Sequence, residues 1–122
     1  MTTVLTKRVY ETPDPADGFR VLVDRVWPRG MTKEKVKADL WLKEVAPSTE
    51  VRKEFCHDPA LWDQFKAHYF AELDDHPQFI AQLLDQAAKG TLTLLYSARE
   101  TQFNQAVALR EYLIARIKNK AG

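Results

Sequence analysis

The segment covering residues 19–27 constrains the fold more than any other part of the sequence. Its central residues 21–23 are Val, Leu and Val, and further apolar side chains follow at Val26 and Trp27. Apolar character that is almost continuous is typical of an interior strand covered on both faces of a sheet. Pro28 then favours extended geometry in Trp27, and the turn that follows ends the strand. The segment therefore predicts a buried strand.

Strand-like and helical segments alternate along the rest of the chain. Residues 4–10 and 91–96 also have the composition of strands, and residues 39–45 resemble a short strand less clearly. Capping residues and apolar spacings of three and four predict helices over residues 33–38, 48–56, 58–73 and 77–90, and a last helix that follows residues 97–100 and frays at 118–122. This alternation predicts an α/β fold, a small parallel sheet flanked by helices, as one domain of residues 1–122.

Composition narrows the class of protein. The 122 residues are 45% hydrophobic and include three Trp, four Tyr and six Phe, which is enough for a core without cross-links. Cys56 is the only cysteine, so an internal disulfide is excluded and a reducing compartment is expected. Charged residues interrupt the first 25 positions, which argues against a signal peptide or a membrane span. We therefore expect a cytoplasmic protein with no membrane partner, of undefined oligomeric state.

The sequence contains no motif that indicates a metal site or a particular cofactor. His68 and His76 are eight residues apart without a companion ligand at metal-binding spacing, so no metal site is expected. The glycine-rich phosphate loops and the common hydrolase motifs are absent. Cys56 and His57 are adjacent, and adjacent residues of a helix do not face each other, so we do not expect them to act as a thiol–imidazole pair.

Charged and aromatic residues follow the strand of residues 19–27. Asp24, Arg25, Trp27 and Arg29 lie within six positions. The planar guanidinium of arginine binds phosphate or carboxylate, and tryptophan stacks on rings. The alternative interpretation is structural, with Asp24 pairing with an arginine to hold the loop and Trp27 belonging to the core.

A second polar cluster follows the strand of residues 91–96. Ser97 and Arg99 come directly after it, and Asn104 is expected in the first turn of the last helix. The N-terminus of a helix favours an anion, although ordinary capping by Ser97 or Thr101 is an equal alternative. Because ligands of open α/β sheets collect beyond the carboxyl ends of the strands, the two clusters together predict a cationic pocket.

The leading functional hypothesis is that this pocket binds a small phosphorylated or carboxylated ligand, nucleotides included. If the protein is an enzyme, Asp24 and His57 are the candidates for proton transfer. A nucleic-acid-binding module that uses the basic segment 25–37 is the main alternative, which the formal net charge of +1 disfavours. A third alternative is an interaction protein that presents its acidic helical face, within residues 58–75, to a basic partner.

Several short motifs resemble one protein family. They are Asp17 and Gly18, residues 20–25 (RVLVDR), 27–30 (WPRG), Lys33 and Glu34, residues 41–44 (WLKE), 46–48 (APS), 57–59 (HDP), Trp62, residues 95–98 (LYSA) and Asn104. In this spacing the chain resembles the YeaO-like branch of domain of unknown function 488, from about Lys7 to Ile114.

The resemblance implies a compact bacterial α/β protein and brings no reaction, substrate or cofactor with it. It also implies histidines around Asn104 at the start of the last helix, where this chain has Phe103 and Gln105. If those histidines serve chemistry in relatives, this chain lacks them, whereas Arg25, Arg29 and Asn104 are retained.

Overall fold

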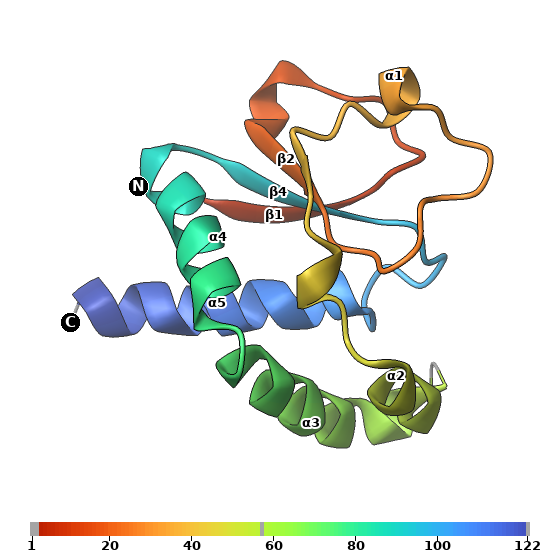
Figure 1. Ribbon diagram of the computed structural model, residues 1–122, viewed down its shortest axis with the longest axis vertical. Coiled ribbons are helices and arrows are strands. Elements are labelled where there is room, and N and C mark those ends of the chain that lie inside the picture. The colour runs from red at the N-terminus through yellow and green to blue at the C-terminus, as the bar shows by residue number, and fades with distance from the viewer. Residues whose placement is uncertain (1–2, 57, 122) are drawn as a thin grey trace.

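A computed structural model describes residues 3–56 and 58–121, the last two of these by their backbone alone. Within the described residues, four parallel strands form one sheet in the order β1-β4-β2-β3 (Figure 1). The strands are β1 (Val4–Arg8), β2 (Phe19–Leu22), β3 (Leu40–Trp41) and β4 (Leu92–Tyr96). The predicted α/β class with a parallel sheet and flanking helices is therefore confirmed.

The two faces of the sheet pack against separate cores because successive strand residues point to opposite faces. On β4, Leu92 and Leu94 belong to the large core formed with the helices, whereas Leu95 belongs to a smaller core on the opposite face. Strand β2 divides in the same way, with Val21 in the large core and Leu22 in the small one. Most side chains of these two strands are apolar because both faces are covered; the exceptions, Arg20 on β2 and Thr93 on β4, are buried.

Five α-helices are found in the described part of the chain: α1 (Lys33–Val36), α2 (Thr49–Phe55), α3 (Trp62–Asp74), α4 (Pro77–Lys89) and α5 (Gln105–Ala121). In Figure 1, α3 and α5 lie below the sheet and α1 lies above it. The predicted N-caps Thr32 and Ser48 are confirmed, since their side chains accept the backbone N–H groups of Lys35 and Val51. Short 3₁₀ turns occupy Pro15–Asp17, Lys43–Val45 and Pro59–Leu61, the last capped by Asp58.

Several predicted boundaries differ from the structure. Strand β1 ends at Arg8 instead of residue 10, and α1 ends at Val36 instead of residue 38. Strand β2 ends at Leu22, earlier than the predicted residue 27, because the chain leaves the sheet after the Val23 N–H bonds to the Leu95 carbonyl at 3.1 Å. Only Leu40–Trp41 of the segment 39–45 is strand, and a 3₁₀ turn follows. Helix α5 begins at Gln105 and continues to Ala121, past the position where fraying was expected.

A buried charge network ties α1 to the sheet. Arg20 on β2 donates to Asp17 at 2.5 Å and to the carbonyls of Val36 and Lys37 at 2.6 and 3.0 Å. Lys7 of β1 reaches the same Asp17 carboxylate at 3.1 Å. Burial by itself raises the pKa of Asp17, but the hydrogen bonds to the carboxylate outweigh burial and hold the pKa below its usual value of 3.8.

This network makes stability sensitive to acid. The contribution of Asp17 is fully present above its usual pKa of 3.8 and is lost as the pH falls through the lower pKa of the folded state. We therefore expect the free energy of unfolding to decrease below about pH 4. The measurement is urea unfolding between about pH 3 and pH 6, in which Asp17→Asn should flatten the acid limb. An acid limb of the same steepness in the variant would contradict this role for Asp17.

Candidate functional site

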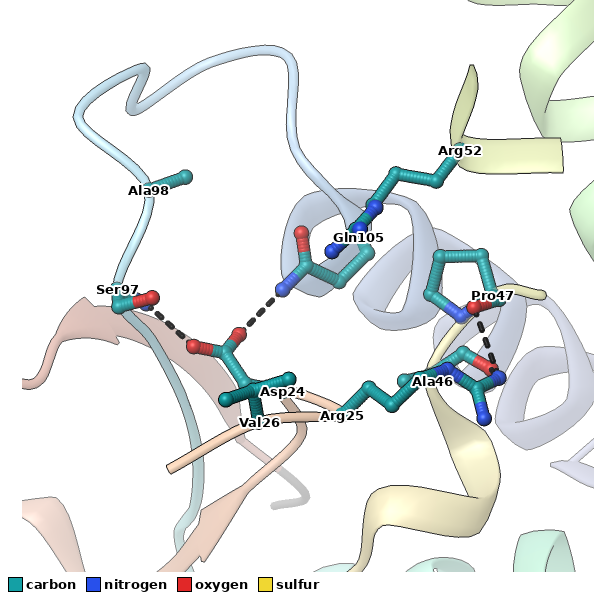
Figure 2. Close-up of a pocket in the computed structure, with 9 residues that line it drawn as sticks. All are labelled: Asp24, Arg25, Val26, Ala46, Pro47, Arg52, Ser97, Ala98 and Gln105. Atoms are coloured by element: carbon teal, nitrogen blue, oxygen red, sulfur yellow. Dashed lines mark hydrogen bonds between the residues drawn. The ribbon is translucent and has the colours of Figure 1, made fainter. Parts of the chain in front are cut away.

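A cavity of about 230 Å³ opens beyond the carboxyl ends of β2 and β4 (Figure 2). The topology explains its position, since β4 pairs directly with β2 and their ends therefore lie side by side. The third wall comes from the chain around the start of α2. The lining residues are Asp24, Arg25, Val26, Ala46, Pro47, Arg52, Ser97, Ala98 and Gln105.

Asp24 supplies a carboxylate at the base of this cavity. The residue is only 7% exposed, and its two oxygens accept the backbone N–H of Ser97 at 3.0 Å and the side-chain amide of Gln105 at 2.5 Å. Figure 2 shows Asp24 held between these two groups. Burial raises the pKa of the Asp24 carboxyl, and the hydrogen bonds from Ser97 and Gln105 and the charge of Arg52 offset part of the rise.

Two arginines from different parts of the chain line the cavity. Arg25, in the loop after β2, donates to the carbonyl of Pro47 at 3.0 Å and, at the limit of a hydrogen bond, to that of Ala46 at 3.5 Å. It thereby joins the β2 loop to the start of α2. Arg52 lies on α2, and Figure 2 shows its side chain extending from that helix toward Gln105. Both arginines are exposed.

The loop after β4 is fixed from the far side by β1. Arg8, the last residue of β1, donates through Nε to the carbonyl of Ala98 at 2.9 Å and through Nη2 to that of Ser97 at 3.3 Å. Ser97 is thus held by Arg8 through its carbonyl and by Asp24 through its N–H. This wall of the cavity is held by hydrogen bonds with the last residue of β1 and with the loop after β2.

The start of α5 lies further along the chain than the sequence indicates. Asn104 accepts the N–H of Val107 at 3.0 Å and donates to the Glu100 carbonyl at 2.7 Å, and it is only 2% exposed. Asn104 therefore caps α5 instead of lying in its first turn, and neither Ser97 nor Thr101 is adjacent to the helix start. Gln105, the next residue, carries the amide that reaches Asp24.

The other predicted site residues lie outside the cavity lining. Trp27 packs in the small core, donates through its indole N–H to the Met31 carbonyl at 2.7 Å and meets Trp41 edge to face at 5.4 Å. Arg29 and Arg99 do not line the cavity formed by the described residues. His57 lies outside the described part of the chain. Of the three arginines predicted to converge, only Arg25 lines this cavity.

The sequence analysis did not predict that Arg52 and Gln105 line the cavity. It also did not predict that Arg8 holds the loop after β4. Arg52 had one usable signal, because it follows the well-capped start of a helix by one turn. Its position opposite Asp24 depends on the path of residues 42–48, which no local pattern specifies. Phe103, at the other position where histidine was implied, packs edge to face on Trp62 at 5.4 Å.

Comparison with known proteins decides the family. Residues 3–122 match the family DUF488-N3i, described as the inactive DUF488-N3 subclade. The chain belongs to DUF488-N3i. The resemblance to the YeaO-like branch is confirmed by "Uncharacterized protein YeaO" of Escherichia coli (strain K12), which is 47% identical over 107 residues, 88% of this chain and 93% of YeaO.

Mycobacterial proteins are also similar to this DUF488-N3i chain. "Uncharacterized protein Mb3100c" of Mycobacterium bovis and "Uncharacterized protein Rv3073c" of Mycobacterium tuberculosis are each 38% identical over 115 residues, 94% of this chain and 97% of theirs. No solved structure matches the chain.

In the described residues no helix is long and apolar enough to span a membrane. In the same residues no three His, Cys, Asp or Glu side chains are grouped as metal ligands.

Proposed function

We propose that this DUF488-N3i protein binds a small phosphorylated or carboxylated molecule in the cavity between β2, β4 and α2, without transforming it. The observation that carries the proposal is that Arg25 and Arg52, from separate segments, line one cavity next to a buried carboxyl whose oxygens already accept hydrogen bonds. Guanidinium groups bind phosphate and carboxylate through paired donors. The family description as inactive supports binding without chemistry.

The charges of the cavity favour one anionic group. Arg25 and Arg52 each carry a positive charge, and an ionised Asp24 cancels one of them. Arg25 uses Nη2 on the Pro47 and Ala46 carbonyls, which leaves its other donors free to bind a ligand. In the described residues no acceptor is hydrogen-bonded to the side chain of Arg52, so its guanidinium is free to turn toward an anion.

The size of the cavity limits the ligand. Pockets that enclose drug-sized molecules have volumes of about 300–1,000 Å³, and this cavity, at about 230 Å³, is smaller. It suits a phosphate or a short carboxylic acid. A nucleotide would place its phosphoryl end between the arginines and leave its base outside.

Titration calorimetry with inorganic phosphate, propionate and adenosine monophosphate tests the proposal. We expect the wild-type protein to bind at least one of these anions and Arg52→Ala to weaken that binding about tenfold or more, since a charge-assisted hydrogen bond is lost. The matched control is Arg29→Ala, which removes an exposed arginine outside the cavity and should change the affinity less than about twofold. The proposal would be contradicted if none of the three anions gave a heat of binding, or if Arg29→Ala weakened binding as much as Arg52→Ala.

The same variants decide the nucleic-acid alternative. The cations of segment 25–37, Arg25, Arg29, Lys33, Lys35 and Lys37, are exposed, as a nucleic-acid surface requires. In that case Arg29→Ala would weaken binding to an oligonucleotide, Arg52→Ala would not, and the affinity would fall steeply as salt increases. If the cavity binds a small ligand, Arg52→Ala should weaken binding of that ligand more than Arg29→Ala does.

A further inference from the structure

The cavity presents a carboxylate to its ligand as well as two arginines. Asp24 lines the cavity together with Arg25 and Arg52. A carboxylate has about four lone-pair positions. The Ser97 N–H and the Gln105 amide take one on each oxygen, and the Ser97 side chain also hydrogen-bonds to the carboxylate. Asp24 therefore keeps acceptor capacity. A ligand that carries only negative charge leaves this capacity unused and is repelled by it.

From this arrangement we infer that the ligand is a small amino acid, with its carboxylate on Arg25 and Arg52 and its ammonium group on Asp24. The inference rests on the proposed function and specifies the ligand of the same site. An amino acid carries both charges on groups joined by one carbon, so each charge meets its opposite within a single small cavity. A phosphate or a simple carboxylic acid satisfies the arginines alone.

The remaining lining residues suit a short aliphatic side chain. Val26, Ala46, Pro47 and Ala98 contribute no ionisable side chain to the cavity, and Val26 is 67% exposed at its rim. The volume of about 230 Å³ leaves little room beyond the charged groups and such a side chain. We therefore expect alanine, 2-aminobutyrate, valine or leucine to fit better than a charged or aromatic amino acid.

Matched pairs of compounds test this inference on the wild-type protein. Alanine, 2-aminobutyrate, valine and leucine are titrated beside propionate, butyrate, 3-methylbutyrate and 4-methylpentanoate, which lack only the amino group. We expect at least one amino acid to bind about tenfold to hundredfold more tightly than its partner acid, the gain of one charge-assisted hydrogen bond. Because this comparison needs no variant, it does not depend on whether a mutant folds.

The variant Asp24→Asn distinguishes the two ligand classes by the direction of its effect. Asparagine keeps the size of the side chain and can still accept the Ser97 N–H, but it removes the charge. Binding of the amino acid should weaken about tenfold or more, whereas binding of the partner acid should be unchanged or stronger because a repulsion is removed. Asp75→Asn, an exposed residue outside the cavity lining, makes the same change in net charge and should alter neither affinity.

The outcomes separate the inference from the proposed function. If the partner acids or phosphate bind as tightly as the amino acids, or if Asp24→Asn strengthens both classes, the amino-acid inference is overturned while an anion site that depends on Arg52 remains. If neither class binds, both are overturned. The inference is supported if an amino acid binds more tightly than its partner acid and Asp24→Asn removes this difference. The thermal unfolding of the variant must match that of the wild type.

Discussion

Replacing Gly18 with alanine is expected to destabilise the protein by about 2 to 5 kcal/mol. Gly18 has φ of 65°, and a Cβ atom there would lie 2.2 Å from the Thr91 carbonyl oxygen. That carbonyl also accepts the N–H of Phe19 at 2.9 Å, so it cannot retreat without loosening the entry of β2 beside β4. The estimate combines the cost of a left-handed conformation with the cost of overpacking.

Gly30→Ala is the matched control for this prediction. Gly30 has a similar φ of 76°, but a Cβ atom there meets nothing within 4 Å. We expect it to cost about 1 to 2 kcal/mol, the conformational part alone. Urea unfolding monitored by tryptophan fluorescence measures both variants. Equal losses in the two would show that the contact with Thr91 does not limit this position.

The second large effect is expected at Arg20. Arg20→Met removes a guanidinium that is 5% exposed, together with its hydrogen bonds to Asp17 and to the carbonyls of Val36 and Lys37. Breaking one side of a buried ion pair typically costs about 3 to 5 kcal/mol. Because Lys7 still reaches Asp17, we expect the lower end of this range, with α1 released from the sheet as its structural consequence.

The chain offers an exposed ion pair as the control for Arg20. Arg116 donates to Asp74 at 2.8 Å, with side chains that are 44% and 60% exposed. Arg116→Met should cost less than about 1 kcal/mol, because exposed pairs contribute little. Equilibrium unfolding of the two arginine variants measures the difference, and hydrogen exchange of the Val36 region reports the release of α1. A loss at Arg20 as small as that at Arg116 would contradict the structural role of the buried network.

The sequence is sufficient to predict where the strands lie, the caps of α1 and α2, and the edge of the sheet where polar groups gather. The apolar runs around Val21 and Leu94 are long enough to indicate strands covered on both faces, and Ser48 follows the ordinary chemistry of helix caps. Asp24 and Ser97 each follow a strand, so their meeting follows from the pairing of β2 with β4. Local patterns and the general rule for parallel sheets account for this part of the site.

The partners of Asp24 could not be predicted because they depend on tertiary geometry and on competition between caps. Ser97, Thr101 and Asn104 all have cap-forming side chains, and only the packing of α5 selects Asn104 and thereby aims Gln105 at the cavity. Arg52 is placed by the return of the chain after β3. Tryptophan is a residue type that stacks on ligand rings, but Trp27 packs against the small core, where its indole N–H donates to the Met31 carbonyl.

The position of β4 determines when the protein can fold during synthesis. Strand β4 is the last of the four strands in the described residues, yet it lies between β1 and β2 and pairs with both. A nascent chain that has not yet released residues 92–96 from the ribosome leaves β1 without a partner strand and β2 paired with β3 alone, and it exposes the apolar side chains that β4 covers. Native structure therefore forms late, once the carboxyl-terminal third has emerged, and premature termination before that point leaves a chain that cannot assemble its sheet.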